Sequence, residues 1–223
     1  MADIERARQL MVDAQKAMDA IETYTCVIHC HERIKGKVRK PESIFSRFRK
    51  PRSVYLRWQK GPYEGLQASH HPDRDGPSKF QARETGLKGL AGATTWDHSA
   101  PIIDSMYPHH FRTHETSVAH LLALSAEIQE KAVRLGKLSI ADLSEVDDPL
   151  LGKRTSRLVC ELSKDPADGL RWSRTEFYFD TDTKLPLHFK LYDLDGEMFG
   201  EYAFKQFEAN AQLPPDAFDL KKL

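Results

Sequence analysis

The sequence lacks most features that identify a site or a location at first sight. Lys and Arg together number 33, and so do Asp and Glu, which leaves no net charge to recruit nucleic acid. No stretch approaches the roughly 18 consecutive apolar residues of a membrane-spanning helix. The G-x-S-x-G, H-E-x-x-H, P-loop and G-x-G-x-x-G motifs are absent as well. These absences argue against a nucleic-acid-binding protein, an integral membrane protein and the common enzyme classes.

Cysteine is scarce, with Cys26, Cys30 and Cys160 in 223 residues. Cys26 and Cys30 lie in a strand-like run, where α-carbons four residues apart are separated by roughly 13 Å. That separation is too long for a disulfide. Cys160 could meet one of the other two, but we predict three small, buried thiols.

An apolar leader is also missing, since the first residues, MADIERARQ, are polar. No signal peptide is therefore expected in this sequence. Two interpretations remain open. The protein is cytoplasmic if Met1 is its native start, or it is exported and its signal has been removed. A chain of 223 residues is most simply a single domain.

The spacing of apolar residues changes along the chain. A stripe with steps of three and four predicts a helix over residues 3–22. From residue 23 the period becomes two, and short turns separate the runs, which predicts an antiparallel meander over residues 23–85. Residues 86–114 have glycines, prolines and histidines but no sustained period, and a strong helical pattern follows up to Gly136. We interpret residues 86–136 as an irregular excursion, which acts as a mobile cover, and a helix.

The last third, residues 137–223, returns to a strand period. Within it, LPLHFKLYDLDGEMF at residues 185–199 predicts two strands joined by a two-residue turn at Asp195-Gly196. No alternation of strands and helices occurs, so the strands are expected to pair antiparallel. A sheet this large twists and curls, which conceals its edges.

The predicted fold class is therefore α+β. We expect a strongly curled, unclosed antiparallel β-sheet, or half-barrel, with helices covering its concave face. An apolar concave face is suited to a hydrophobic ligand. The residues predicted to line it are Leu56, Trp58, Phe177, Phe179, Leu187, Phe189 and Leu191.

Ten histidines raise the question of a metal site. His29 and His31 would share one face of a strand, but no acid or cysteine accompanies them at a ligand spacing. We predict that no metal and no cofactor is bound. His109, His110 and His114 lie in the irregular excursion and are predicted to form a polar mouth. The alternative is a hydrolase or metal site that uses these three central histidines.

Residues 33–60 hold eleven Lys or Arg residues and one acid, Glu42. Such a band can contact an anionic membrane surface. It can equally be the solvated outer face of three strands.

The final segment carries a resemblance to known proteins. FYFDTDTKLPLHFKLYDLDGEMFGEYAFKQFEANAQLPPDAFDL resembles the terminal segment of the LolA/LolB-like superfamily of periplasmic lipoprotein carriers. YTCVIHCHERIKGK, KPRSVYLRWQKGP and HFRTHETSVAHLL, in that order, are similar to a bacterial family of exported proteins of unknown function. The resemblance implies the curled, helix-covered sheet, an acyl chain in its concavity and a place in the periplasm or cell envelope.

These observations favour a non-enzymatic protein that binds or carries a lipid or acylated molecule. The first alternative is a protein-interaction module whose concavity is filled by its own helix. The expected partner is thus a hydrophobic small molecule or acyl chain, with no nucleic acid.

Overall fold

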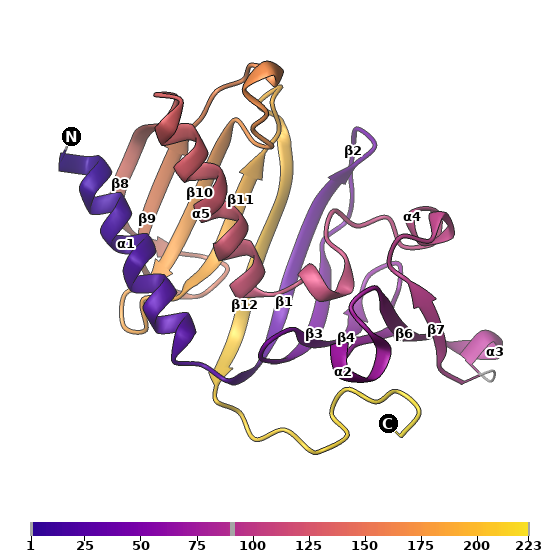
Figure 1. The fold of residues 1–223 in the computed structure, drawn as a ribbon. Coiled ribbons are helices and arrows are strands. Elements are labelled where there is room, and N and C mark those ends of the chain that lie inside the picture. The colour runs from indigo at the N-terminus through magenta and orange to yellow at the C-terminus, as the bar shows by residue number, and fades with distance from the viewer. Residues whose placement is uncertain (1, 90–91, 223) are drawn as a thin grey trace. The chain divides into compact units, whose positions relative to one another are not determined.

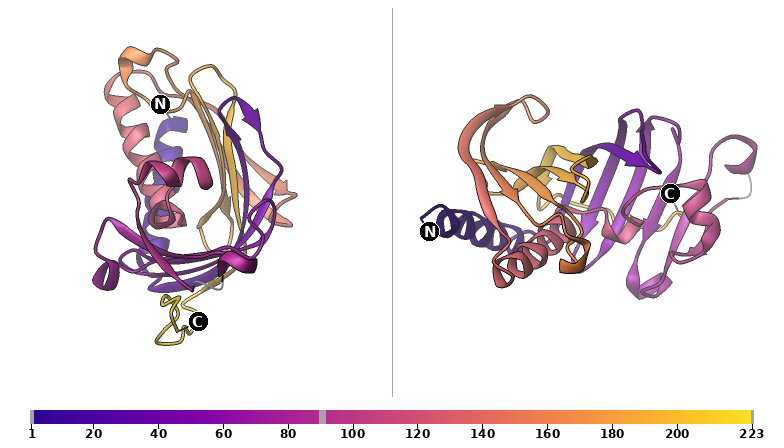
Figure 2. Two further views of the ribbon diagram at one scale, coloured as in Figure 1. Left: turned by 90° about the vertical axis from the view of Figure 1, so that its right-hand side faces the viewer. Right: turned by 90° about the horizontal axis from the view of Figure 1, so that it is seen from above.

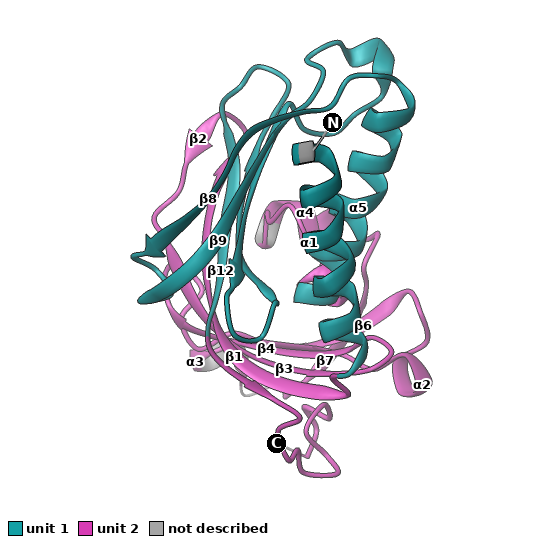
Figure 3. Cartoon of the chain, turned by 90° about the vertical axis from the view of Figure 1, so that its left-hand side faces the viewer, with its two compact units in different colours: residues 1–20, 118–205 teal, residues 21–117, 206–223 magenta. Residues whose placement is uncertain are grey.

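A computed structural model describes residues 2–89 and 92–222. The chain divides into two compact units (Figure 3). Unit 1 comprises Met1–Ala20 and Val118–Lys205, and unit 2 comprises Ile21–Ser117 and Gln206–Leu223. The single domain expected from the sequence stays a prediction. Within the described ranges, no helix combines the length and the apolar character needed to cross a membrane.

Unit 1 combines two long helices with a run of antiparallel strands (Figure 1). Its strands follow the order β12-β11-β10-β9-β8. The elements are α1 (Ala2–Asp19), α5 (Val118–Arg134), β8 (Ser139–Asp148), β9 (Lys153–Glu161), η2 (Pro166–Asp168), β10 (Arg174–Asp180), β11 (Pro186–Tyr192) and β12 (Met198–Ala209), whose last residues belong to unit 2.

The two long helices lie side by side over one face of these strands (Figures 1 and 2). The helical stripe read from the sequence explains why α1 packs there, because Ala7, Ala14 and Met18 are buried. Leu122 and Ala132 are among the buried residues of α5. Both helices keep a polar face toward solvent, as expected for amphipathic helices on a sheet.

The strands of unit 1 bury side chains on both faces. Phe177 on β10 lies opposite Phe189 on β11 and opposite Leu158 on β9, which gives one apolar face. The other face carries Tyr178 opposite His188, and both are also buried. The period of two thus separates an apolar face from a buried polar one.

Unit 2 contains the other antiparallel strands, in the order β7-β6-β5-β4-β3-β1, with β2 paired to β1. Its elements are β1 (Thr23–Ile34), β2 (Lys37–Val38), β3 (Glu42–Arg49), β4 (Ser53–Lys60), β5 (Gln67–His70), α2 (Pro72–Asp75), β6 (Lys79–Arg83), α3 (Gly86–Gly89), β7 (Thr94–Asp97), α4 (Pro101–Met106) and η1 (Thr113–Glu115).

Alternate residues of β1 and β3 are buried, as the sequence pattern predicts. The buried face of β1 begins with Tyr24 and continues through Cys26 to Cys30 and Glu32. In the register of the pair, Tyr24 lies opposite Phe48, and Cys30 lies opposite Glu42. The buried face is therefore apolar at one end of the hairpin and polar at the other.

The C-terminal segment covers the opposite face of the unit 2 strands. Phe218 and Leu220 pack in a buried cluster with Tyr55 of β4. The Ser69 hydroxyl donates to the Phe218 carbonyl oxygen at 2.5 Å, and Arg47 donates to the Ala217 carbonyl at 3.2 Å. Part of the basic band is thus occupied by contacts within the chain, and its predicted contact with a membrane stays a prediction.

The structure confirms the α+β class with antiparallel strands, and it confirms three buried, free cysteines. The predicted curl of one continuous sheet stays a prediction. One element corrects the interpretation of the sequence. The excursion at 86–114, of which residues 90–91 lie outside the described residues, includes β7, which pairs with β6. Residues 139–148 form β8, within the segment for which the sequence predicts strands.

The hairpin loop at residues 193–197 is longer than predicted. The Asp193 amide donates to the Glu197 carbonyl at 2.9 Å, which leaves three residues in the loop rather than two. Gly196 adopts a left-handed backbone with φ of 83°. The Asp193 carboxylate accepts hydrogen bonds from the Asp195 and Glu197 amides, which stabilises the longer loop.

Candidate functional site

An apolar groove lies between the two helices of unit 1 and has a volume of about 640 Å³. We call it the α1/α5 groove. Most of its surface comes from apolar side chains, with a few charged and amide groups around them. Its lining residues are Ile4, Ala7, Arg8, Met11, Val12, Gln15, Leu122, Ala126, Gln129, Glu130, Val133, Arg134 and Leu138.

Both helices contribute apolar side chains to the groove. Ala7 on α1 and Ala126 on α5 are short residues, while Val12 and Val133 remain 40% and 41% exposed. Together with the other apolar lining residues, they leave a concave apolar surface open to solvent. The groove can therefore accommodate an apolar ligand within unit 1.

The structure places the seven predicted lining residues in the cores of the two units, and none of them lines the α1/α5 groove. In unit 1 the rings of Phe177 and Phe189 pack edge to face with centroids 5.6 Å apart, and Phe179 lies 6.1 Å from Phe177. Leu187 and Leu191 are also buried there. Their role in ligand binding stays a prediction.

The other predicted lining residues, Leu56 and Trp58, belong to β4 of unit 2. Both are buried. The Trp58 indole donates to the Glu42 carboxylate at 2.7 Å, so Trp58 takes part in a polar cluster rather than in an apolar wall.

That polar cluster joins the buried face of β1 and β3 to the loop after α4. We call it the acid–histidine cluster, and its members are Cys30, Glu32, Glu42 and His109. His109 Nδ1 lies 2.8 Å from Glu32 Oε2, and His109 Nε2 lies 3.7 Å from Glu42 Oε2. The His110 amide also donates to Glu32, at 3.2 Å. One imidazole is thus held between two buried carboxylates.

The environment shifts the protonation of each group. Burial works to lower the pKa of His109, but the hydrogen bond and charge of Glu32 outweigh it, and the pKa is raised. Burial raises the pKa of Glu42, with the charge of Glu32 adding to the effect. Burial and the two carboxylates raise the pKa of the Cys30 thiol well above its ordinary value, so the free thiol is protonated at neutral pH.

A groove of about 940 Å³ lies beside this cluster in unit 2. Glu42 forms part of its lining, together with the cationic residues Arg39, Lys40 and Lys60. Gly61 is required at this point, because a Cβ atom there would lie 2.9 Å from Glu42 Cγ. The groove therefore reaches one member of the acid–histidine cluster, Glu42.

A second histidine cluster occupies the opposite end of the unit 2 strands. The ring centroids of His98 and His114 are 4.1 Å apart, and that of His70 is 5.2 Å from His98. Phe80 stacks on His98 at 4.8 Å. Burial and the neighbouring imidazoles lower the pKa of His98 to about 3, so the cluster is built around a neutral ring.

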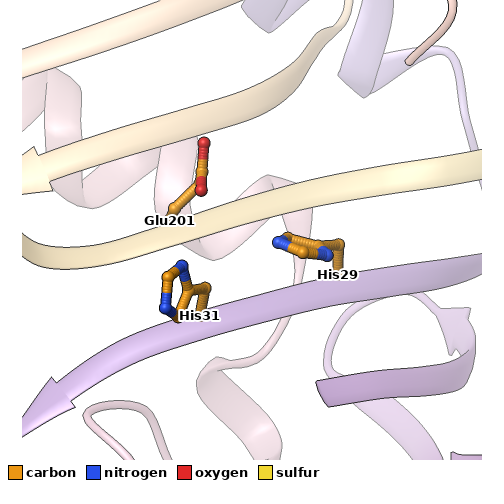
Figure 4. A group of neighbouring side chains, drawn as sticks. All are labelled: His29, His31 and Glu201. Carbon is orange, nitrogen blue, oxygen red and sulfur yellow. The ribbon is translucent and has the colours of Figure 1, made fainter. Parts of the chain in front are cut away.

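His29 and His31 lie on β1 with their side chains on the same face, as predicted (Figure 4). Their ring centroids are 6.3 Å apart and the ring planes meet at 77°. Glu201, which Figure 4 also draws, accepts hydrogen bonds within unit 1 from His188 and Lys190, each at 3.1 Å.

The three histidines of the predicted mouth do not form one site. His109 and His110 contact Glu32, whereas His114 joins the second cluster with His70 and His98. The sequence analysis missed the carboxylates. A signal was present, since Glu32 continues the buried alternation of β1 and Glu42 is the one acid in the basic band.

Comparison with models of protein families finds a match over most of this chain. The family model described as "Protein of unknown function (DUF1571)" matches residues 21–222. The chain belongs to this family. No curated protein matches the sequence. The resemblance to a family of unknown function is therefore confirmed.

Solved structures resemble the fold at low sequence identity. MucB, in a complex with MucA(peri), matches with a TM-score of 0.50 and 13% identity over 96% of this chain and 59% of MucB. The lipoprotein LppX of Mycobacterium tuberculosis matches with a TM-score of 0.49 and 9% identity over 93% of this chain and 98% of LppX. A LolA superfamily protein of Nitrosomonas europaea matches with a TM-score of 0.40 and 8% identity over 97% and 99% of the two chains. Identities this low concern the fold alone.

Proposed function

We propose that this protein binds a single acyl chain in the α1/α5 groove without chemically changing it. The observation that carries the proposal is an apolar groove of about 640 Å³ on the surface of unit 1. This volume lies within the range of small-molecule sites, which are lined mainly by apolar side chains and a few polar groups. The site differs from the one expected from the sequence, but the class of ligand is the same.

The affinity follows from the area removed from water. Each buried methylene contributes about 0.8 kcal/mol, so ten methylenes give roughly 8 kcal/mol before the cost of ordering the chain. Half to all of that amount corresponds to dissociation constants from about millimolar to about micromolar. The groove therefore suits a carrier, which must release its ligand as well as bind it.

The charges around the groove favour an acyl chain with an anionic head. Arg8 and Arg134 are exposed at its lining, against one acid, Glu130. The Arg8 guanidinium already forms an ion pair with the Glu5 carboxylate on the same helix, at 3.2 Å. A carboxylate or phosphate head can pair with Arg134, which stands at the C-terminal end of α5.

The proposal includes a place in the periplasm or cell envelope, where lipids need carriers between membranes. A second candidate is a protein-interaction module. It is supported by the MucB structure, which was solved in complex with MucA(peri). The two candidates differ in the ligand that they predict for the protein, which is an acyl chain for the carrier and another protein for the interaction module.

The test is a titration of the protein with fluorescent fatty acids of increasing chain length. Each added methylene that enters the groove should tighten binding about fourfold, the equivalent of about 0.8 kcal/mol. The variant Val133→Glu should weaken binding at least about tenfold, because it places a charge against the acyl chain.

Leu135→Glu is the matched control. Leu135 is 43% exposed, close to the 41% of Val133, but it does not line the groove. Its binding should equal that of the unmodified protein. Affinity that does not change with chain length would favour the interaction module. An equal loss in both variants would show that the ligand binds elsewhere.

A further inference from the structure

The acid–histidine cluster of unit 2 combines the side chains that transition metals prefer. One ligand atom from each of Cys30, Glu32 and His109 lies within 4.8 Å of the other two. A thiol, a carboxylate and an imidazole are the three ligand types of zinc sites in proteins. We propose, against the metal-free protein predicted from the sequence, that unit 2 binds a divalent transition metal, Zn²⁺ by ligand preference, through these three side chains.

The strand geometry supports the ligand set. Cys30 and Glu32 are two residues apart on β1, so their side chains leave the same face of the strand. His109 comes from the loop after α4 and reaches them across 77 residues of sequence. Its Nδ1 atom lies 2.8 Å from Glu32 Oε2, and a metal would take the place of the Nδ1 proton, with the two side chains moving slightly apart to admit it.

The fourth member of the cluster supplies an outer partner for the imidazole. His109 Nε2 is buried and has no hydrogen-bond partner within the described residues, and Glu42 Oε2 lies 3.7 Å from it. When Nδ1 holds a metal, Nε2 carries the proton and faces the Glu42 carboxylate. A carboxylate behind the ligating histidine is a common feature of metal sites, because it fixes the tautomer and the ring orientation. The Trp58 indole N–H in turn donates a hydrogen bond to the Glu42 carboxylate at 2.7 Å, which fixes its orientation.

The cluster also lies next to a groove. Its outer member, Glu42, forms part of the lining of the groove of about 940 Å³. Three protein ligands would leave a fourth tetrahedral position for water. Binding would release the thiol proton of Cys30 and the Nδ1 proton of His109, since a thiolate and an unprotonated ring nitrogen are the ligands. The inference is independent of the proposed acyl-chain site, because the α1/α5 groove belongs entirely to unit 1.

The deciding experiment is a titration of chelator-treated protein with Co²⁺, followed by competition with Zn²⁺. A Cys30 ligand predicts a thiolate-to-cobalt charge-transfer band in the near ultraviolet at stoichiometric metal, which Zn²⁺ then removes. Elemental analysis of protein purified without chelator should find stoichiometric metal. The absence of the band in the unmodified protein would overturn the proposal without any variant.

Three variants locate the site. Cys30→Ser should remove the charge-transfer band, and Glu42→Gln should keep it while weakening metal binding about tenfold. His114→Ala is the control, since His114 belongs to the second histidine cluster. Circular dichroism checks that each variant folds. Loss of metal in His114→Ala, with full retention in Cys30→Ser, would place the metal in the other cluster and refute the assignment.

Discussion

Two buried histidines, one in each unit, have opposite charge preferences. His188 of unit 1 and His98 of unit 2 are 2% and 7% exposed. Burial works to lower the pKa of His188, but its hydrogen bonds to the Asp148 and Glu201 carboxylates raise it above its ordinary value. For His98, burial and two neighbouring imidazoles act in the same direction, and the pKa falls to about 3.

The contrast shows that the partners, rather than burial, decide the charge of a histidine. His188 Nδ1 lies 2.6 Å from Asp148, and Nε2 lies 3.1 Å from Glu201. Carboxylates facing both ring nitrogens favour the imidazolium form, in which both nitrogens donate. His98 instead packs between Phe80 and His114, and burial together with the neighbouring imidazoles outweighs the attraction of the Asp97 carboxylate.

The largest expected effect comes from removing the cation of unit 1. His188→Gln leaves Asp148, a fully buried carboxylate, without its charged partner. The free energy of unfolding should fall by about 3 to 5 kcal/mol near pH 6, the usual cost of breaking a buried pair. Urea unfolding measures it. Adding Asp148→Asn to His188→Gln should lower the free energy of unfolding little further. A double-variant loss equal to the sum of the two single-variant losses would contradict the pairing.

The same variant should change the pH dependence in a defined direction. The raised pKa of His188 means that its contribution is complete below its ordinary pKa of 6.5 and is lost as pH rises through the folded value. The lowered pKa of Glu201, at about 2, means the converse: its contribution is complete above 4.5 and is lost in acid. The loss of unfolding free energy caused by His188→Gln should thus be greatest between pH 4.5 and pH 6.5 and smaller in alkali.

The next effect is the acid sensitivity of unit 2. In the unfolded chain His98 is protonated below its ordinary pKa of 6.5. In the folded chain its pKa is about 3, so it stays neutral until the pH falls to that value. His98 therefore reduces stability by up to about 1.4 kcal/mol for each pH unit in this window. His98→Phe keeps the stacking on Phe80 and should remove this slope. Urea unfolding at pH 7 and pH 5 compares the two proteins. Parallel acid losses in both would contradict a neutral His98.

The smallest effect tests whether His188 is the main partner of Glu201. Lys190 also contacts Glu201, at 3.1 Å, but its side chain is 33% exposed. Solvent screens such a pair, so Lys190→Met should cost less than about 1 kcal/mol. The measurement is the midpoint of thermal unfolding beside that of His188→Gln. A loss as large as that of His188→Gln would make Lys190 the dominant cation.

Sequence reasoning located most elements of both units but not their polar contacts. The period of two identified β1 and β3, because one face of each is buried, and it identified β4 although Tyr55 on the other face is buried as well. At β8 the apolar signal is weak, so the sequence predicted strands only for the broad range of residues 137–223. It failed at β7, a strand of four residues that is too short to establish a period.

The candidate sites depended on contacts that no local pattern contains. The α1/α5 groove required two helices separated by about a hundred residues of chain to pack together with small side chains between them. The predicted histidines 109, 110 and 114 were chosen because loops carry function, yet they separate into two clusters. Spacing along a loop does not determine which strand each side chain reaches.

Local patterns along the chain were sufficient to predict the antiparallel α+β class, the amphipathic helices and the three buried thiols. Each depends on local periodicity or on the number and spacing of cysteines, which neighbouring residues specify directly. The contact of Glu32 with His109, and the position of His188 between Asp148 and Glu201, became visible only in the folded protein. The physical reason is that buried charges need partners within about 3 Å, and strand register and loop packing bring those partners together from distant parts of the chain.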